Sequence, residues 1–281
     1  YRAARILNKR AFIVVSDSSP ALRPMMTKFQ DNPDYNSDMF VTPEQARNMV
    51  DAKTILVVVD VGSADRTEAP ELVNLTKNIV VIDHHRQNDG LIENPVLSYI
   101  EPNASSASEM VAEILQYITD SVKLPAIEAE AMYAGMIIDT DGFQNKTGSR
   151  TFEAAAFLRK CGADVTRVRL QLRDDMATCK ARAEAVTHAR IEGKCAFSIC
   201  PAEGLDAPQV VGAQAANELL NVSGVEASFV ATEVNEMVFI SARSFEMNVQ
   251  LVMERLGGGG HATIAGAQLK NMTAAEALEQ V

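Results

Sequence analysis

The sequence predicts an α/β protein in which a parallel-sheet domain is followed by a smaller α+β domain. In the first half, short runs of Val and Ile alternate with helical patterns, as in a doubly wound parallel sheet. From about Leu170 strands and helices follow in mixed order. The length of 281 residues also fits two domains at ~150 residues each. We expect one domain at residues 1–172 and the other at 173–281.

The first domain begins with Tyr1–Lys9, which has the pattern of the end of an amphipathic helix. Its strands are expected to be buried on both faces, because they are continuously apolar: Ala11–Val15, Ile55–Val59 and Ile79–Ile82. Its helices are expected at Pro43–Ala52, Ser105–Ile118, Ala126–Ile137 and Thr151–Lys160.

The second domain is expected to begin with a long, Ala-rich helix from about Leu170 to Arg190. Strands should follow at Cys195–Cys200, Ala227–Thr232 and Met237–Ala242. Helices are expected at Ala213–Leu220 and Asn248–Leu256.

The composition excludes several classes of protein. With 47% hydrophobic and 22% charged residues the chain is globular, not disordered. No apolar run approaches the ~18 residues of a membrane span. Its 26 basic and 37 acidic residues give a net charge of −11, which argues against a protein that coats long nucleic acid. The four cysteines form no CxxC pair, so we expect reduced thiols.

Acidic residues follow four apolar segments of the first domain. They are Asp17, Asp60, Asp83 and Asp139, the last accompanied by Asp141. In an open parallel sheet the ligand crevice lies outside the carboxyl ends of the strands, so these carboxylates should meet there and repel unless a cation separates them. A single Asp at such a position is also a common helix cap or turn residue.

Two histidines, His84 and His85, follow Asp83 directly. Adjacent residues at a strand end should point to opposite sides, so that one imidazole can face a metal and the other the substrate. Mixed carboxylate and imidazole ligands suit Mn²⁺ and similar divalent ions. His188 stands alone on a helical pattern and is expected to be solvated or structural.

A run of four glycines, Gly257–Gly260, precedes His261. Without Cβ atoms, several backbone N–H groups of such a loop can approach phosphate or sugar oxygens. No Lys-Ser/Thr follows, so the run is not a P-loop. Arg243 could supply a cation. A flexible linker and a solvated arginine remain the alternatives.

Three motifs occur in this order: Asp83–His85 (DHH), Asp139–Phe143 (DTDGF) and Gly257–His261 (GGGGH). With them, essentially the whole chain resembles the DHH/DHHA1 phosphoesterase family. The resemblance implies an active-site cleft between the domains and two Mn²⁺ ions held by Asp60, His84 and Asp139. It makes Asp83 and His85 catalytic, with Asp83 supporting the site and His85 facing the scissile phosphate. The implied nucleotide-binding residues are Arg243, Gly258, Gly259, Gly260 and His261.

Within this family, three segments are most similar to members that hydrolyse cyclic di-AMP: Tyr99–Tyr117, Thr147–Asp164 and Gly257–Leu269. The implied reaction is Mn²⁺-dependent hydrolysis to 5′-pApA, by attack of a metal-activated water on phosphorus. Hydrolysis of short oligoribonucleotides or pApA is one alternative. The implied partner is a small cyclic dinucleotide, with no long nucleic acid and no membrane contact within this chain, and a homodimer remains open.

The family's first motif, a His followed by two Asp at short spacing, does not occur in this sequence. This absence removes three expected metal ligands, so we expect an incomplete metal site in this chain, which can lack activity on its own. The chain begins within a helical pattern at Tyr1 and ends soon after a capping box at Thr273–Glu276, so we expect an excised piece of a longer protein. The resemblance implies a cytoplasmic location and a membrane-anchored parent. A non-catalytic module that binds cyclic dinucleotides is the alternative that this absence leaves open. Residues 61–66 and Ile264 also depart from the family pattern.

Overall fold

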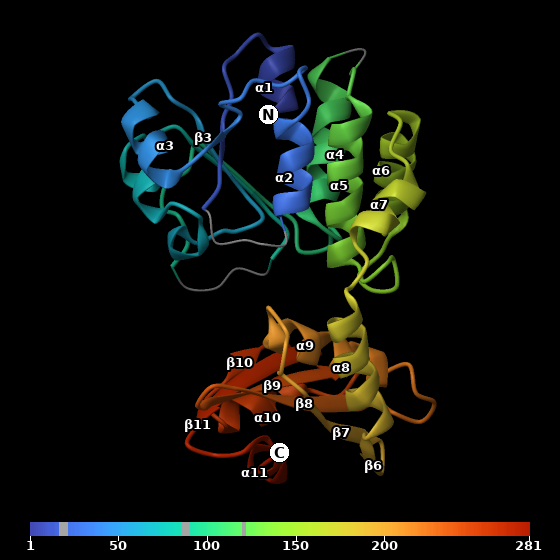
Figure 1. Cartoon of the computed structure of the whole chain (residues 1–281). Coiled ribbons are helices and arrows are strands. Elements are labelled where there is room, and N and C mark those ends of the chain that lie inside the picture. The colour runs from blue at the N-terminus through green and yellow to red at the C-terminus, as the bar shows by residue number, and fades with distance from the viewer. Residues whose placement is uncertain (17–21, 86–89, 120–121) are drawn as a thin grey trace. The chain divides into compact units, whose positions relative to one another are not determined.

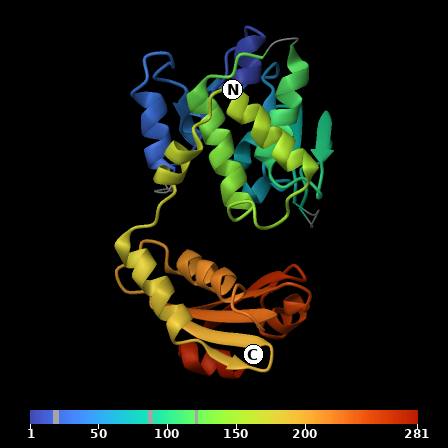
Figure 2. The same ribbon diagram turned by 90° about the vertical axis from the view of Figure 1, so that its right-hand side faces the viewer.

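The computed structural model describes residues 1–16, 22–85, 90–119 and 122–281. The chain forms two compact units, which are described separately: unit 1 is Tyr1–Arg173 and unit 2 is Asp174–Val281 (Figures 1 and 2). Asp17, one of the expected acidic residues, lies outside the described residues.

Unit 1 contains parallel strands, as the sequence predicted. β1 (Ile13–Val14) pairs with β2 (Phe40–Val41). A second sheet has the order β3-β4-β5, formed by Leu56–Val59, Ile79–Asp83 and Leu97–Ile100. Sequence reasoning missed the short strand β5, which follows the Asn94-Pro95 turn signal.

Burial of the first-domain strands on both faces was a wrong expectation for β3. Val58 is buried and packs with Val81, but Val57 and Val59 are 50% and 42% exposed. The reason is positional: β3 is the outer strand of its sheet, whereas the central β4 is enclosed by β3 and β5 and by helix α4.

Four helices of unit 1 agree with the predicted positions: α3 (Pro43–Met49), α4 (Ala107–Ile118), α5 (Ala126–Asp139) and α6 (Ser149–Lys160). α1 (Arg2–Ile6) lies within the helical pattern at the start of the sequence. α2 (Arg23–Gln30), α7 (Val165–Gln171) and the short 3₁₀ helices η1 (Ala64–Arg66) and η2 (Pro70–Asn74) were not predicted. α4, α5 and α6 pack side by side (Figure 1). Their shared core contains the fully buried Met136 and Leu158. α4 begins where the Ser106 side chain accepts the Glu109 backbone N–H at 3.1 Å.

The single long helix expected from Leu170 to Arg190 is wrong. The structure has two helices instead, α7 and α8 (Met176–Thr187). α8 has its own N-cap, because the Asp175 carboxylate accepts the Thr178 backbone N–H at 2.7 Å. Two consecutive acidic residues, Asp174 and Asp175, were the local signal for this helix start.

Unit 2 is a mixed six-stranded sheet in the order β10-β11-β9-β8-β7-β6. The strands are β6 (Arg190–Glu192), β7 (Cys195–Cys200), β8 (Ala227–Val234), β9 (Met237–Ser244), β10 (Gly259–Gly260) and β11 (Ile264–Lys270). Only β7 and β8 run parallel among these pairs. The helices after α8 are α9 (Pro208–Leu219), α10 (Val249–Arg255) and α11 (Ala274–Glu279).

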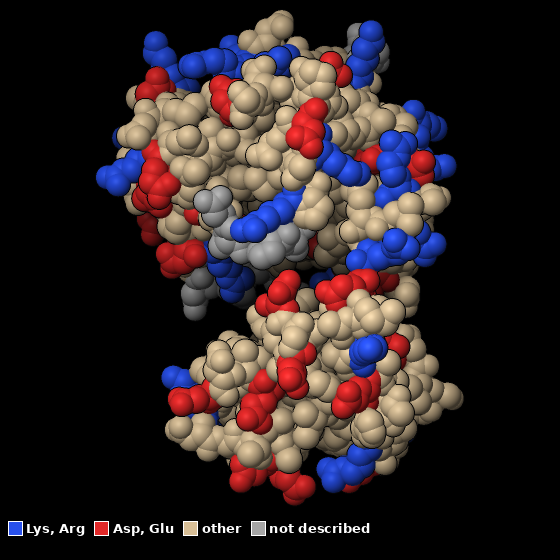
Figure 3. Space-filling view, in the orientation of Figure 1, with Lys and Arg blue, Asp and Glu red and all other residues tan. Residues whose placement is uncertain are grey.

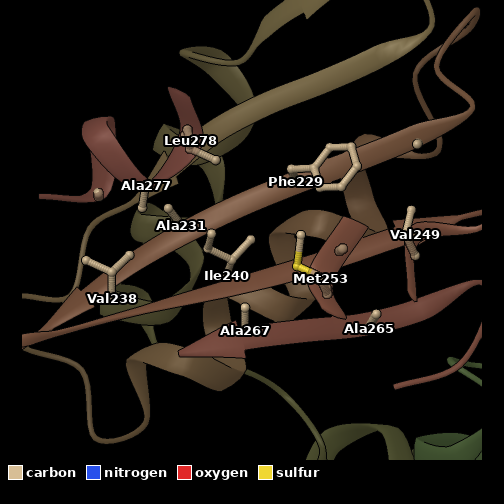
Figure 4. Packing of buried hydrophobic residues seen from close by; sticks show 13 residues of the cluster. Phe229, Ala231, Val238, Ile240, Val249, Met253, Ala265, Ala267, Ala277 and Leu278 are labelled. Atoms are coloured by element: carbon tan, nitrogen blue, oxygen red, sulfur yellow. The ribbon is translucent and has the colours of Figure 1, made fainter. Parts of the chain in front are cut away.

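Helices cover both faces of the unit 2 sheet. On one face Phe229, Ile240 and Ala267 pack against Met253 of α10 and Leu278 of α11 (Figure 4). On the other face α8 and α9 pack against residues of β7 and β8, in a core rich in alanine. Side chains of β9 alternate between buried and half-buried, as the period of two in a strand requires.

No helix among the described residues combines the length and apolarity needed to span a membrane. Acidic side chains predominate over basic ones on the face of unit 2 shown in Figure 3. This distribution agrees with the acidic total of the sequence.

Candidate active site

The carboxyl ends of β3 and β4 bring Asp60 and His84 together. Asp60 follows β3, and its backbone N–H donates to the Ile82 carbonyl oxygen of β4 at 2.9 Å. Its φ of 70° is left-handed, a conformation that Asp tolerates better than most residues. The Asp60 Oδ1 atom lies 3.2 Å from His84 Nε2.

Asp139 reaches the same imidazole from a helix and not from a strand, which corrects the sequence expectation. It is the last residue of α5, and its Oδ2 atom lies 3.8 Å from His84 Nε2. The chain then turns sharply: Thr140 Oγ1 donates to the Met136 carbonyl and accepts the Phe143 N–H. The apolar pair before Asp139 resembled a strand end, but it continues the helix and leaves Ile138 exposed.

His85 is held by Asp83. The His85 Nδ1 atom lies 2.7 Å from Asp83 Oδ1, which also accepts the His85 backbone N–H at 3.1 Å. The Asp83 side chain is buried, whereas that of His85 is 45% exposed. This pair therefore presents the second ring nitrogen, Nε2, as the available functional atom of His85.

The two imidazoles do not point to opposite sides as expected. Their ring centroids lie 4.4 Å apart at an angle of 55°. The alternation rule fails because β4 ends at Asp83, so both histidines lie beyond the regular strand. One ligand atom each from Asp60, His84 and His85 lies within 4.8 Å of the others. His85 is thus also within reach of a cation at this point.

The charge around His84 favours a bound cation. Burial lowers the pKa of this imidazole and is the largest single effect, but interaction with Asp60 and the charge of Asp139 together outweigh it and raise the pKa. Burial, followed by the charge of Asp60, raises the pKa of Asp139. His84 Nε2 is buried and has no hydrogen-bond partner among the described residues. An imidazole and two carboxylates around this atom fit a divalent ion such as Mn²⁺.

The glycine run of unit 2 is ordered, so a flexible linker is the wrong alternative. Gly259 and Gly260 form β10 and pair with Gly266 and Ala265 of β11. A Cβ atom on Gly258 would collide with the Gly266 carbonyl, and one on Gly260 would collide with the backbone of β11. A Cβ on Gly259 would meet no atom within 4 Å. Two of the three predicted glycines are therefore explained by close strand packing, and Gly259 faces open space.

Arg243 lies beside this loop. It is paired with Ile264 in the β9–β11 register, next to the Ala265–Gly260 pair. Its Nε donates to Asn217 Oδ1 of α9 at 2.9 Å. The His261 N–H donates to the Ile264 carbonyl oxygen at 2.7 Å and closes the turn. The predicted nucleotide-binding residues thus gather at one place in unit 2, while the predicted metal ligands gather in unit 1. Asn217 was missed, because no motif marks it.

The chain has the organisation of a two-domain DHH phosphoesterase. Its first unit is a parallel α/β unit with carboxylates and imidazoles near the strand ends, and its second is a mixed-sheet unit with an ordered glycine loop. Residues 5–136 match the DHH family, N-terminal domain, and residues 192–281 match the DHHA1 domain. The chain belongs to this family.

Several known proteins are similar to this chain. The cyclic-di-AMP phosphodiesterase PdeA of Listeria monocytogenes is 38% identical over 284 residues, covering 100% of the chain and 43% of the relative. The cyclic-di-AMP phosphodiesterase GdpP of Geobacillus thermodenitrificans is 45% identical over 246 residues, covering 86% and 37% respectively. The chain therefore spans about two fifths of the length of these relatives.

A solved structure supports the fold. An exopolyphosphatase-related protein from Bacteroides fragilis superimposes with a TM-score of 0.80 at 18% identity. The superposition covers 100% of this chain and 84% of the other. At that identity the likeness establishes the architecture alone.

Proposed function

We propose that this chain is the catalytic part of a Mn²⁺-dependent phosphodiesterase that hydrolyses cyclic di-AMP to 5′-pApA. The observation that supports it most directly is the buried His84 Nε2, which lacks a hydrogen-bond partner among the described residues and lies 3.2 Å from Asp60 and 3.8 Å from Asp139. An unpaired buried polar atom is costly unless a ligand uses it. The similarity to two proteins named cyclic-di-AMP phosphodiesterases supports the choice of substrate.

In this proposal Asp60, His84 and Asp139 contribute ligands to a site for two divalent ions. Bound ions would activate water for attack on phosphorus and offset the charge of the phosphoryl oxygens. Carboxylate repulsion at the ends of β3 and α5 is then relieved by the cations. His84 contributes through Nε2, because its Nδ1 atom already faces the Ala104 carbonyl oxygen at 3.3 Å.

Asp83 and His85 act on the substrate side of the site. Asp83 is buried and holds His85 Nδ1, so the exposed imidazole is restrained with Nε2 available. Through Nε2, His85 faces the scissile phosphate, while the buried Asp83 carboxylate holds the ring at Nδ1.

In unit 2 the open side of Gly259, together with His261 and Arg243, binds the nucleotide. Backbone N–H groups and a cation suit a ligand that carries two phosphates. Asn217 restrains the Arg243 guanidinium through Nε. Gly258 and Gly260 contribute by allowing β10 to pack closely on β11.

The full-length gene product, incubated with Mn²⁺ and either cyclic di-AMP or pApA, tests this proposal when products are resolved by chromatography. We expect cyclic di-AMP to be consumed and 5′-pApA to appear. Consumption of pApA with cyclic di-AMP left intact would show an oligoribonucleotide hydrolase instead. Calorimetric binding of cyclic di-AMP without turnover would show a binding module.

A further inference from the structure

The buried carboxylate of Glu109 lies one peptide group away from His84. Glu109 is in the first turn of α4 and is 1% exposed. Its Oε2 atom accepts the Ser105 backbone N–H at 3.2 Å and the Ser105 hydroxyl at 2.6 Å. The same oxygen accepts the Thr151 hydroxyl of α6 at 2.6 Å. Three donors from two segments thus fix one carboxylate oxygen.

The Ser105 N–H and the Ala104 carbonyl belong to the same peptide group, which is planar and rigid. The Ala104 carbonyl oxygen faces His84 Nδ1 at 3.3 Å on the opposite side of that group. A carbonyl can only accept, so the N–H at Nδ1 of His84 points to Ala104, and Nε2 is the nitrogen that faces Asp60 and Asp139. Glu109 therefore bonds one end of a peptide group whose other end holds Nδ1 of His84.

We propose that Glu109 is a positioning residue for His84, acting through the Ala104–Ser105 peptide group. This inference rests on the proposed role of His84 as a metal ligand. A carboxylate that accepts the peptide N–H polarises the peptide and strengthens its carbonyl as an acceptor. Carboxylates that orient a ligating histidine usually contact it directly, whereas here a peptide group lies between them.

The buried network also explains why a charged residue occupies this position. Unpaired buried charge is costly, but Ser105 and Thr151, themselves 0% and 1% exposed, supply hydroxyl donors to Glu109. A helix-packing role alone would be met by an apolar side chain. The network instead converges on the loop that contacts His84.

Glu113 offers a matched control on the same helix. It lies one turn after Glu109 and also joins α4 to α6, through Arg150 Nε at 2.7 Å and Nη2 at 2.6 Å. It makes no described contact with the Ala104–Ser105 peptide group. Glu109→Gln and Glu113→Gln therefore both disturb the α4–α6 connection, but only the first disturbs the orientation of His84.

The first test detects the hydrogen bond from His84 Nδ1 to the Ala104 carbonyl oxygen by nitrogen-15 NMR on the metal-free chain. A proton on Nε2 does not enter the comparison, because Asp60 can accept it. We expect the Nδ1 hydrogen bond in the wild type and in Glu113→Gln, and a substantial loss of it in Glu109→Gln. Absence of this hydrogen bond in the wild type, or an unchanged hydrogen bond in folded Glu109→Gln, would overturn the proposal.

The second test measures Mn²⁺ affinity of the full-length gene product by electron paramagnetic resonance. We expect Glu109→Gln to weaken binding by about 10- to 100-fold, the usual cost of losing a group that orients a ligand. Glu113→Gln should remain within about twofold of wild type. Equal affinity of folded Glu109→Gln and wild type would contradict the proposal.

Thr151→Val serves if Glu109→Gln fails to fold, because it removes one donor to the carboxylate and keeps the volume. It should weaken the Nδ1 hydrogen bond of His84 in the same direction and by less, and an unchanged hydrogen bond would contradict the proposal. The measurement of this hydrogen bond needs neither metal nor substrate. If Glu109→Gln weakens the Nδ1 hydrogen bond as expected but the wild type does not hydrolyse cyclic di-AMP, the proposed function is rejected and the role of Glu109 stands.

Discussion

His84 Nε2 lies 3.2 Å from Asp60 Oδ1, although 24 positions separate the two residues in the sequence. Parallel pairing of β3 with β4 produces this contact, since Val59, the last residue of β3, is opposite Ile82, and β4 ends one residue later at Asp83. The imidazole is buried, whereas the Asp60 side chain is 52% exposed. A cation at this point would be enclosed on the His84 side and open to solvent on the Asp60 side.

Replacement of His84 by Ala should reduce Mn²⁺-dependent turnover of cyclic di-AMP by more than about 100-fold, since loss of a ligand costs more than loss of a group that orients it. The measurement is a steady-state assay on the full-length gene product. His188→Ala is the control, because His188 is exposed at the end of α8 and, among the described residues, hydrogen-bonds the Glu184 carbonyl oxygen of its own helix. Retained activity in His84→Ala would reject the assignment of this ligand.

Two neighbouring glycines, Gly258 and Gly259, should differ in their effects on stability and on ligand binding. Gly258→Ala places a Cβ against the Gly266 carbonyl and should lower the free energy of unfolding of unit 2 by about 1–3 kcal/mol. Gly259→Ala meets no atom within 4 Å and should leave stability unchanged, while weakening the binding of cyclic di-AMP. Denaturant unfolding and calorimetry give the two quantities. Equal destabilisation by both substitutions would contradict this division.

Asn217→Ala should weaken substrate binding without changing the chemical step. It removes the acceptor of the Arg243 Nε donor at 2.9 Å and loosens the guanidinium, which keeps its Nη1 bond to the Ala242 carbonyl oxygen. We expect KM to rise by about 3- to 10-fold, the value of one hydrogen bond, with kcat nearly unchanged. Gln214→Ala is a control on the same helix, because Gln214 accepts from Arg182 and not from Arg243. A fall in kcat with constant KM would place Asn217 elsewhere in the mechanism.

Cys200 should resist alkylation that modifies Cys179. Cys179 is exposed, whereas Cys200 is buried, and burial raises the pKa of the Cys200 thiol to about 11. At pH 8 almost none of it is the reactive thiolate. Mass spectrometry after brief iodoacetamide treatment should find Cys179 modified and Cys200 intact. Early modification of Cys200 in the folded protein would show that its thiol is not buried as described.

The raised pKa of Cys200 also predicts how the free energy of unfolding changes with pH. The folded pKa of Cys200 lies above the ordinary value of 9.0, so the folded state retains the proton over a range where the unfolded state releases it. Its contribution to stability is therefore complete below about pH 9 and is lost as the pH rises towards 11. Unfolding of wild type and Cys200→Ala in this range measures the difference. If the stability of the wild type relative to Cys200→Ala increased with pH in this range, the prediction would be wrong.

Several elements could be predicted because their signals are local. The Val- and Ile-rich runs of β3 and β4 and the helical pattern that contains α4 follow from short segments. The break between α7 and α8 was missed because the polar sequence around it has no strong apolar periodicity, although Asp175 is a residue type that caps helices. Asp139 was grouped with the strand ends, although a helix was expected at Ala126–Ile137; α5 continues through Asp139 and packs against α4 and α6.

The sequence by itself determined the α/β class, the family resemblance and the residue types able to bind a divalent ion and a nucleotide. The contacts of His84 required the tertiary structure. Strand pairing brings Asp60 to Nε2, the end of α5 brings Asp139, and the Ala104 carbonyl oxygen faces Nδ1. The role inferred for Glu109 also needed the structure, since a peptide plane joins it to His84 and no sequence pattern reports the orientation of a peptide group.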